Sequence, residues 1–160
     1  MILLLLRHAH AGDPAKWAGD DDLRPLSERG RGQATGLGRL LAANGEAPDL
    51  LISSPRTRAL ETAELVAHEV GARVEIDSRL AGPLDPDVVG AILRSAGDAK
   101  RPCLVGHDPD FSSLVGELVG LELVALRKGA LARVDLPGDT VAAGRGELRW
   151  LLPPELVAER

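Results

Sequence analysis

Residues 2–10 read Ile-Leu-Leu-Leu-Leu-Arg-His-Ala-His, and this stretch decides the fold. Its apolar part, Ile2–Leu6, is typical of a β-strand buried on both faces, as in a parallel sheet covered by helices. In such sheets ligands bind outside the carboxyl ends of the strands, which is where Arg7 and His8 stand. The apolar run is too short to cross a bilayer, which takes about 20 residues, and no basic segment precedes it as in a signal peptide.

Strand and helix patterns alternate along most of the chain. Short apolar runs predict further strands at 50–53, 74–76 and 103–105. Apolar residues at helical spacing, with capping residues beside them, predict helices at 27–44, 55–70, 86–96 and after Pro109. Residues 11–26 are rich in Asp, Gly and Pro, so we expect a loop there.

The last quarter of the chain has a different pattern. Residues 131–136 and 148–152 form two extended runs on either side of a Gly-rich segment, which predicts an antiparallel hairpin at the sheet edge. Strands that alternate with helices predict a mainly parallel sheet covered on both sides. We therefore expect an α/β fold with residues 1–160 as a single domain. We expect this domain to be a three-layer α/β/α sandwich with a mostly parallel central sheet and an antiparallel C-terminal edge.

Length and charge narrow the class of protein further. The chain has 160 residues, a formal net charge of −5 and a single cysteine, Cys103. A mildly acidic chain lacks the basic surface that nucleic acids and anionic membranes require, so we expect neither as a partner. A single cysteine excludes an internal disulfide bond and a zinc site built from several cysteines. Together with the lack of a signal or membrane-spanning pattern, this favours a cytoplasmic protein.

Three polar clusters directly follow predicted strands, namely Arg7–His10, Ser53–Arg58 and Gly106–Asp108. Because the carboxyl ends of parallel strands meet at one edge of a sheet, we expect these clusters to lie together. Arginine forks bind phosphate oxygens, a helix N-terminus adds N–H donors, and a neutral imidazole can attack phosphorus. Each cluster alone is weak evidence, because such histidines and arginines are often structural. Together they indicate phosphoryl chemistry.

The three clusters resemble the motifs of the histidine phosphatase superfamily. The matching segments are Leu6-Arg-His-Ala-His10, Ser54-Pro-Arg-Thr-Arg-Ala-Leu-Glu-Thr-Ala63 and Val105-Gly-His107. Within the superfamily, the chain is similar to the small branch, the SixA-type phosphohistidine phosphatases. This similarity rests on the short chain and on the segments Arg24-Pro-Leu-Ser-Glu-Arg-Gly30 and Lys128-Gly-Ala-Leu-Ala132. The resemblance covers most of the chain, and the order and spacing of the motifs make the combination specific.

The resemblance implies a nucleophile that becomes phosphorylated, two phosphate-binding arginines, a second pocket histidine and an arginine near the substrate. In this sequence the nucleophile is His8 and the phosphate-binding arginines are Arg7 and Arg58. The second pocket histidine is His107, and the arginine near the substrate is Arg24. Arg56 stands at a variable position of the motif, so we expect it to be more exposed than Arg58. The resemblance implies no metal or other cofactor. The implied partner is a phosphohistidine-containing protein or a small phosphorylated substrate.

Two positions depart from the pattern of the family. Larger relatives often have a Glu or Asp as general acid shortly before the third helix, whereas residues 80–83 here read Leu-Ala-Gly-Pro. Asp85 and Asp108 lie nearby in the sequence, but neither matches that motif. Since the imidazole of phosphohistidine leaves more readily than an alkoxide, the missing acid favours phosphohistidine, or another activated phosphoryl group such as an aryl phosphate, as the substrate. Ala9 replaces a glycine of many relatives, which is a small change.

Three alternatives remain open. The first is a small-molecule phosphomonoesterase of the same superfamily. The second is a metal-dependent hydrolase that uses His8 and His10, with Asp13 and His107 as further ligands, although such enzymes usually carry more ligands in their motifs. The third is a phosphate-binding module without turnover, which the missing acid favours. For His10 itself we expect a loop histidine, and without large insertions we expect a shallow groove that admits a protein surface.

Overall fold

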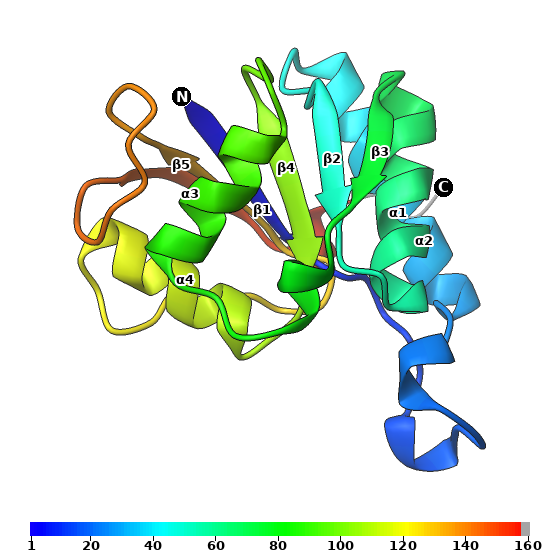
Figure 1. The fold of residues 1–160 in the computed structure, drawn as a ribbon. Helices are drawn as coiled ribbons and strands as arrows, with labels where there is room; N and C mark the ends of the chain where they lie inside the picture. The colour runs from blue at the N-terminus through cyan, green and yellow to red at the C-terminus, as the bar shows by residue number, and fades with distance from the viewer. Residues whose placement is uncertain (158–160) are drawn as a thin grey trace.

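The computed structural model describes residues 1–157, and its centre is a six-stranded β-sheet (Figure 1). The strands lie in the order β3-β2-β4-β1-β5-β6. Their bounds are β1 Ile2–Arg7, β2 Leu50–Ser53, β3 Arg73–Ile76, β4 Pro102–Gly106, β5 Leu131–Asp135 and β6 Glu147–Leu152. The first four strands run parallel, whereas β5 and β6 are antiparallel and close one edge. The expected sheet, with its antiparallel C-terminal edge, is therefore confirmed.

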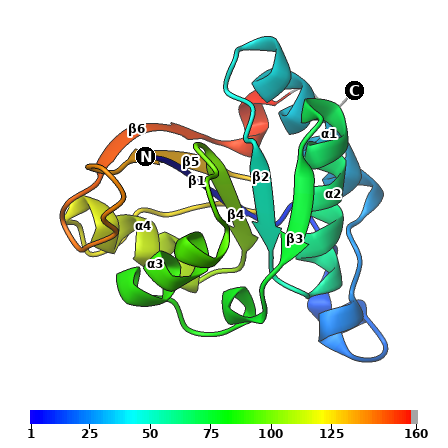
Figure 2. The ribbon, with the colours of Figure 1, turned by 45° about the horizontal axis from the view of Figure 1, so that its top comes forward.

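Helices cover both faces of this sheet, as the two ribbon views show (Figures 1 and 2). Their bounds are α1 Glu28–Ala43, α2 Thr57–Val70, α3 Pro86–Ser95 and α4 Asp110–Val119. Leu3 and Leu5 of β1 belong to a core shared with α3 and α4, whereas Leu4 and Leu6 belong to a core shared with α1 and α2. Successive side chains of a strand point to opposite faces, so a continuous apolar run is what a strand between two helical layers requires. The three-layer α/β/α sandwich is confirmed.

The segment between β1 and α1 is more ordered than the expected loop. It contains two short 3₁₀ helices, η1 (Pro14–Lys16) and η2 (Asp21–Leu23). Each begins at an aspartate, Asp13 or Asp20, whose side chain accepts a backbone N–H two residues later. The abundance of Asp and Pro in this segment therefore marks helix starts as well as turns.

The helix α2 begins later than expected, at Thr57 rather than Pro55. Arg56 precedes the helix with an extended backbone, at φ −63° and ψ 133°, and its side chain does not cap the helix. The hydroxyl of Ser54 accepts the N–H of Arg56 at 3.3 Å instead. Ser54 therefore follows β2 directly and, from within the second polar cluster, holds the entry to α2.

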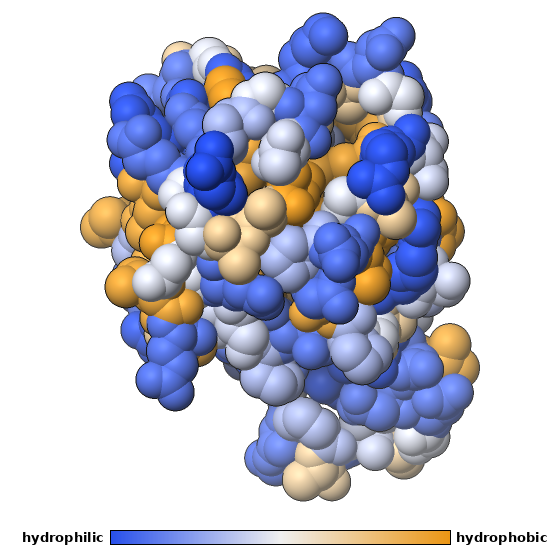
Figure 3. Space-filling view, turned by 60° about the vertical axis from the view of Figure 1, so that its left-hand side comes forward, coloured by the Kyte–Doolittle hydropathy of each residue, from blue (hydrophilic) through white to orange (hydrophobic). Residues whose placement is uncertain are grey.

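No helix within residues 1–157 is long and apolar enough to cross a membrane. Figure 3 shows the face that lies on the left of Figure 1. Hydrophilic residues predominate there, and hydrophobic residues occur in small groups between them.

Candidate active site

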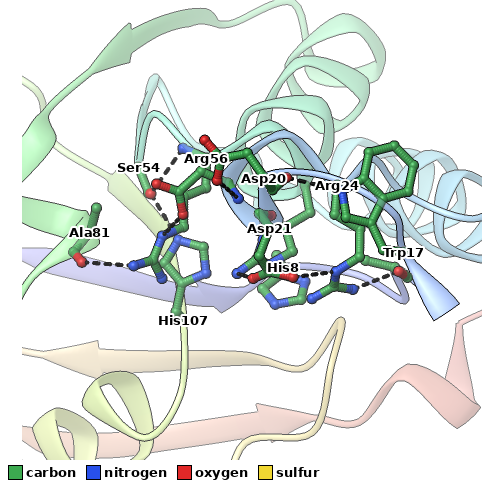
Figure 4. Close-up of polar contacts among 12 residues, drawn as sticks. His8, Trp17, Asp20, Asp21, Arg24, Ser54, Arg56, Ala81 and His107 are labelled. Carbon is green, nitrogen blue, oxygen red and sulfur yellow. Dashed lines mark hydrogen bonds and ion pairs between the residues drawn. The ribbon is translucent and has the colours of Figure 1, made fainter. Parts of the chain in front are cut away.

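The three polar clusters meet at one edge of the sheet. In β1 and β4, Arg7 is the register partner of Gly106, so His8 and His107 each follow directly after neighbouring strand ends. In β2 and β4, Ser53 pairs with Val105, which brings Ser54 to the same edge. Figure 4 shows side chains from all three clusters side by side. The expected convergence follows from the parallel register of three adjacent strands.

His8 is held in one tautomer by the backbone. Its Nδ1 lies 2.7 Å from the carbonyl oxygen of Ala9, which can only accept, so Nδ1 carries the proton and Nε2 is free of one. The residue is only 5% exposed, and burial is the main reason that its pKa falls from 6.5 to about 3. Arg7, Arg58 and His107 lower this pKa further, and only the hydrogen bond to Ala9 opposes them. His8 is therefore neutral at physiological pH.

His107 is the second buried histidine of the site. Its ring centroid lies 5.4 Å from that of His8, and the ring planes are tilted by 52°. Its Nε2 lies 2.8 Å from the hydroxyl of Ser54, and among residues 1–157 it is the acceptor that this hydroxyl contacts, because the other partner of the hydroxyl, the N–H of Arg56, is a donor. This assigns the ring proton to Nδ1. Burial lowers the pKa of His107 to about 3, and positive charges led by Arg56 act in the same direction.

A glycine positions His107. Gly106 ends β4, and a Cβ atom there would lie 2.5 Å from the ring of Phe111. The carbonyl oxygen of His107 accepts the N–H of Phe111 at 2.9 Å, which starts α4 directly beyond the site. Phe111 is fully buried, so a side chain at position 106 would force this ring or the turn to move.

Arg7 and Arg58 approach the histidines from different elements. Nη1 of Arg7 donates to the carbonyl oxygen of Leu126 at 2.8 Å and pairs with Asp108 at 3.3 Å. Nη1 of Arg58, on α2, donates to the carbonyl oxygen of Asp21 at 2.8 Å. Each guanidinium is thus anchored through its far end.

Apart from Nε of Arg56, which forms an ion pair with Asp22, three buried donors at the site have no hydrogen-bond partner among residues 1–157. They are Nε of Arg7, Nε of Arg58 and Nδ1 of His107. A buried polar atom left without a partner costs about 1–3 kcal/mol, so native structures rarely carry several of them together. They belong to Arg7, Arg58 and His107, the three residues whose charges act on His8, and buried donors beside this ring are what a site that binds an anionic ligand requires.

The acidic turn at residues 20–22 completes the site. The sequence predicts only a loop for this segment. Asp21 of η2 accepts Nε of Arg24 at 2.9 Å and pairs with Nη2 of Arg58 at 3.2 Å, as Figure 4 shows in part. The hydrogen bond from Arg24 is the main cause that keeps the pKa of Asp21 below its usual value. Asp22 pairs with Nε of Arg56 at 2.9 Å. Three successive aspartates at 20–22, in a chain rich in arginine, were the available signal.

The structure places Arg24 and Arg56 differently. Arg24 is buried, its Nη1 donates to the carbonyl oxygen of Ala11 at 2.6 Å, and it lies beside Arg58 because both arginines pair with Asp21. The side chain of Arg56 is 30% exposed, against 7% for Arg58, which agrees with the expected difference. Arg56 is nevertheless not a solvated residue, because it pairs with Asp22 and donates to the carbonyl oxygen of Ala81 at 3.4 Å.

The two aspartates nearest the missing acid in sequence are both engaged. Asp85 accepts the N–H of Val88 at 2.8 Å and caps α3. Asp108 accepts the hydroxyl of Ser112 at 2.6 Å and its N–H at 3.0 Å, besides pairing with Arg7. Neither carboxylate is arranged to deliver a proton to a leaving group.

His10, unlike His8, contacts the residue that caps a helix. Its Nδ1 lies 2.7 Å from the hydroxyl of Ser27, the residue that caps α1. Within residues 1–157, no group of three or more His, Cys, Asp or Glu side chains is arranged to hold a metal ion. The residues of the metal-dependent alternative, His8 and His10 with Asp13 and His107, therefore do not form a ligand set.

Comparison with known proteins identifies the family. A family model described as "Histidine phosphatase superfamily (branch 1)" matches residues 3–82. The chain belongs to this superfamily. The matched region contains the first two clusters, including His8 and Arg58. An uncharacterised protein of Picosynechococcus sp. (strain ATCC 27264 / PCC 7002 / PR-6) is 32% identical to this histidine phosphatase over 96% of the chain and 100% of the relative.

Solved structures place the chain near the SixA type of the superfamily. The structure of the protein histidine phosphatase SixA complexed with tungstate superposes with a TM-score of 0.82 and 24% identity, over 96% of this chain and 97% of that one. A proposed phosphohistidine phosphatase SixA from Nakamurella multipartitia gives a TM-score of 0.79 and 26% identity, over 96% and 95%. The SixA-type resemblance seen in the sequence is confirmed.

Proposed function

We propose that this chain, acting as a single histidine phosphatase domain, hydrolyses phosphohistidine through a covalent phosphohistidine intermediate on His8. Membership of the superfamily supports phosphatase activity. The observation that carries the proposal is the unprotonated Nε2 of His8 beside three buried donors that have no partner within residues 1–157. A nucleophile among donors arranged for an oxyanion is the arrangement that phosphoryl transfer requires.

In the first step, Nε2 of His8 attacks phosphorus, a new N–P bond forms, and the bond to the leaving imidazole breaks. Nε of Arg7, Nε of Arg58 and Nδ1–H of His107 are the donors available to the three equatorial oxygens. His107 acts as a neutral donor, because its pKa of about 3 means that the ring carries one proton, on Nδ1, rather than two before substrate binds. In the second step water attacks the phosphorylated His8, the N–P bond breaks, and Nε2 is regenerated with release of phosphate.

The leaving group decides the substrate class. An alkoxide leaves poorly without a general acid, which typically contributes about 10²–10⁴-fold to the rate. Imidazole protonated by water leaves without such help, and both neighbouring aspartates are engaged elsewhere. The arrangement therefore favours phosphohistidine over alkyl phosphates. The substrate is a phosphohistidine-containing protein, with a small phosphorylated molecule as the alternative, and we place the reaction in the cytoplasm without a nucleic-acid or membrane partner.

Binding of an oxyanion has support from the comparisons. The SixA structure that superposes over 96% of this chain is complexed with tungstate, a tetrahedral oxyanion like phosphate. By analogy, the anion in this chain would lie between His8, Arg7, Arg58 and His107, with Arg24 at its margin. Tungstate is accordingly the inhibitor to use as a probe of the intact site.

One comparison of substrates tests the proposal. We expect kcat/KM for a phosphohistidine peptide to exceed that for a simple sugar phosphate by about 10²-fold or more, with p-nitrophenyl phosphate between them. Equal use of the sugar phosphate would favour the small-molecule phosphomonoesterase. Binding of tungstate without turnover of any substrate would favour a phosphate-binding module. Turnover that requires zinc would favour the metal-dependent hydrolase.

A further inference from the structure

A basic groove adjoins the phosphate-binding residues. It has a volume of about 280 Å³, and its charged lining residues are Arg7, Arg29, Arg127, Lys128 and Glu155. Among residues 1–157, four cationic side chains and one carboxylate line this groove, and two of the cations are already paired, Arg7 with Asp108 and Arg127 with Glu155. Arg7 belongs to both the groove and the phosphate site, so a ligand bound to one lies next to the other.

The turn that carries Lys128 is fixed against the catalytic strand. The N–H of Gly129 donates to the carbonyl oxygens of Arg7 at 3.1 Å and of His8 at 2.9 Å. Gly129 has a φ of +83°, and a Cβ atom there would lie 3.3 Å from Oε1 of Gln33. A side chain at position 129 would be strained and crowded, so glycine keeps the turn, and with it Lys128, close to His8.

Lys128 has no carboxylate of its own. Within residues 1–157 its ammonium group makes no hydrogen bond or ion pair, whereas Arg127 beside it pairs with Glu155. Burial lowers the pKa of Lys128, the charges of Arg7, Arg24 and Arg58 lower it further, and the charge of Asp13 opposes them. These like charges repel one another, so an anion that enters the groove would be attracted by all of them.

We propose that this basic groove binds a carboxylate-bearing residue that flanks the phosphorylated histidine of a protein substrate. This inference rests on the proposed function. The Arg127–Glu155 pair shows that a carboxylate approaches this wall of the groove, and it leaves Lys128 as the group that a substrate carboxylate would meet. The groove thereby selects phosphohistidines that lie in an acidic segment, and it acts mainly on KM.

The test compares phosphohistidine peptides that differ only in the flanking residues, which are Glu, Gln or Lys. We expect kcat/KM for the Glu peptide to exceed that for the Gln peptide by about five- to tenfold at low salt, through KM, with the Lys peptide poorest. The preference should shrink at about 0.5 M salt, because ions screen charges in an open groove. Equal kcat/KM for the three peptides would overturn the inference.

Variants locate the effect in the groove. In Lys128→Met the ratio of kcat/KM for the Glu and Gln peptides should fall toward 1, and Lys128→Arg should restore it. Lys100→Met, at the opposite end of the sheet, should keep the wild-type ratio. A preference that survives Lys128→Met combined with Arg127→Gln would contradict the assignment to this groove.

Hydrolysis of the Gln peptide without a preference would reject the groove alone, whereas no hydrolysis of any peptide would reject the proposed function as well.

Discussion

The molecule has cavities at both ends of its sheet, and only one end has the features of an active site. The larger cavity, about 460 Å³, lies at the amino ends of the strands and is lined by Met1, Arg94, Asp98, Lys100 and Asp139 among others. Its charged side chains are two cations and two carboxylates, and the amino group of Met1 is satisfied because it donates to two backbone carbonyl oxygens. The unpartnered buried donors of residues 1–157 lie instead at the carboxyl ends. Buried donors without hydrogen-bond partners therefore indicate the candidate active site better than cavity volume does.

The largest expected difference between the two ends comes from His8. His8→Ala removes the nucleophile, so we expect kcat for a phosphohistidine peptide to fall by more than about 10⁴-fold. The replacement deletes one side-chain hydrogen bond of the fold, so the Tm should fall by only a few degrees. Steady-state kinetics and thermal unfolding measure the two effects.

Lys100→Met is the matched change at the other cavity. We expect its kcat and KM to equal those of the wild type. If His8→Ala retains substantial turnover while remaining folded, His8 is not the nucleophile. If Lys100→Met loses turnover while remaining folded, the comparison between the two ends fails.

A smaller loss is expected for Arg58. Arg58→Ala removes a donor to the transferred phosphoryl group and should lower kcat/KM by about 10²–10³-fold, mostly through kcat. Arg73, on β3, serves as a control because it also pairs with a carboxylate, that of Glu75 at 3.2 Å, but is exposed. Arg73→Ala should leave kcat/KM unchanged. Equal effects of the two substitutions would show that Arg58 acts only through the fold.

The sequence predicts the site well where parallel strand order decides it. His8, His107 and Arg58 come together because each follows or lies near the end of one of three adjacent strands, a relation that alternating strands and helices already imply. Attack on phosphorus, which the sequence indicates, requires an unprotonated ring nitrogen, and the contact of Nδ1 of His8 with Ala9 leaves Nε2 in that state.

Other parts of the site depend on contacts that no local pattern encodes. Asp21 reaches Arg58 across 37 positions of the chain, and nothing in the run of aspartates specifies which arginine it meets. Lys128 lies beside His8 only because β5 returns antiparallel to β1 and the N–H of Gly129 binds that strand. The late start of α2 was missed because Ser54 binds His107 and Arg56 instead of capping the helix at Pro55.

A further difference concerns the response of stability to acid. His8 and His107 have pKa values of about 3 in the folded protein, against 6.5 in the unfolded chain. The unfolded state therefore binds more protons between pH 6.5 and 3, and the free energy of unfolding falls as the pH falls through this window. Each histidine contributes a slope of up to about 1.4 kcal/mol per pH unit.

Urea unfolding at pH 7, 6 and 5 measures this slope. His8→Gln should reduce it, whereas His68→Gln, which changes a side chain that is 85% exposed, should not. The window above pH 5 is chosen because aspartates with lowered pKa values, such as Asp77 and Asp135, lose stability only at more acidic pH. A slope that is the same in all three proteins would show that His8 titrates normally in the folded state.

The smallest expected effect is that of a chelator, since we expect activity to be independent of divalent ions. One ring nitrogen of each histidine that a metal would need already takes part in a hydrogen bond. Nδ1 of His8 donates to the carbonyl oxygen of Ala9, Nδ1 of His10 contacts the hydroxyl of Ser27, and Nε2 of His107 contacts the hydroxyl of Ser54. Arg7 and Arg58 would also repel a divalent cation from Nε2 of His8, the unprotonated nitrogen beside them. Dialysis against EDTA should therefore change kcat/KM by less than about twofold. Because EDTA is itself an anion that the basic groove can attract, the control is EDTA already saturated with calcium. Inhibition by both forms would report competition for the groove, whereas inhibition by free EDTA alone, reversed by zinc, would mean that this end of the sheet binds a metal after all.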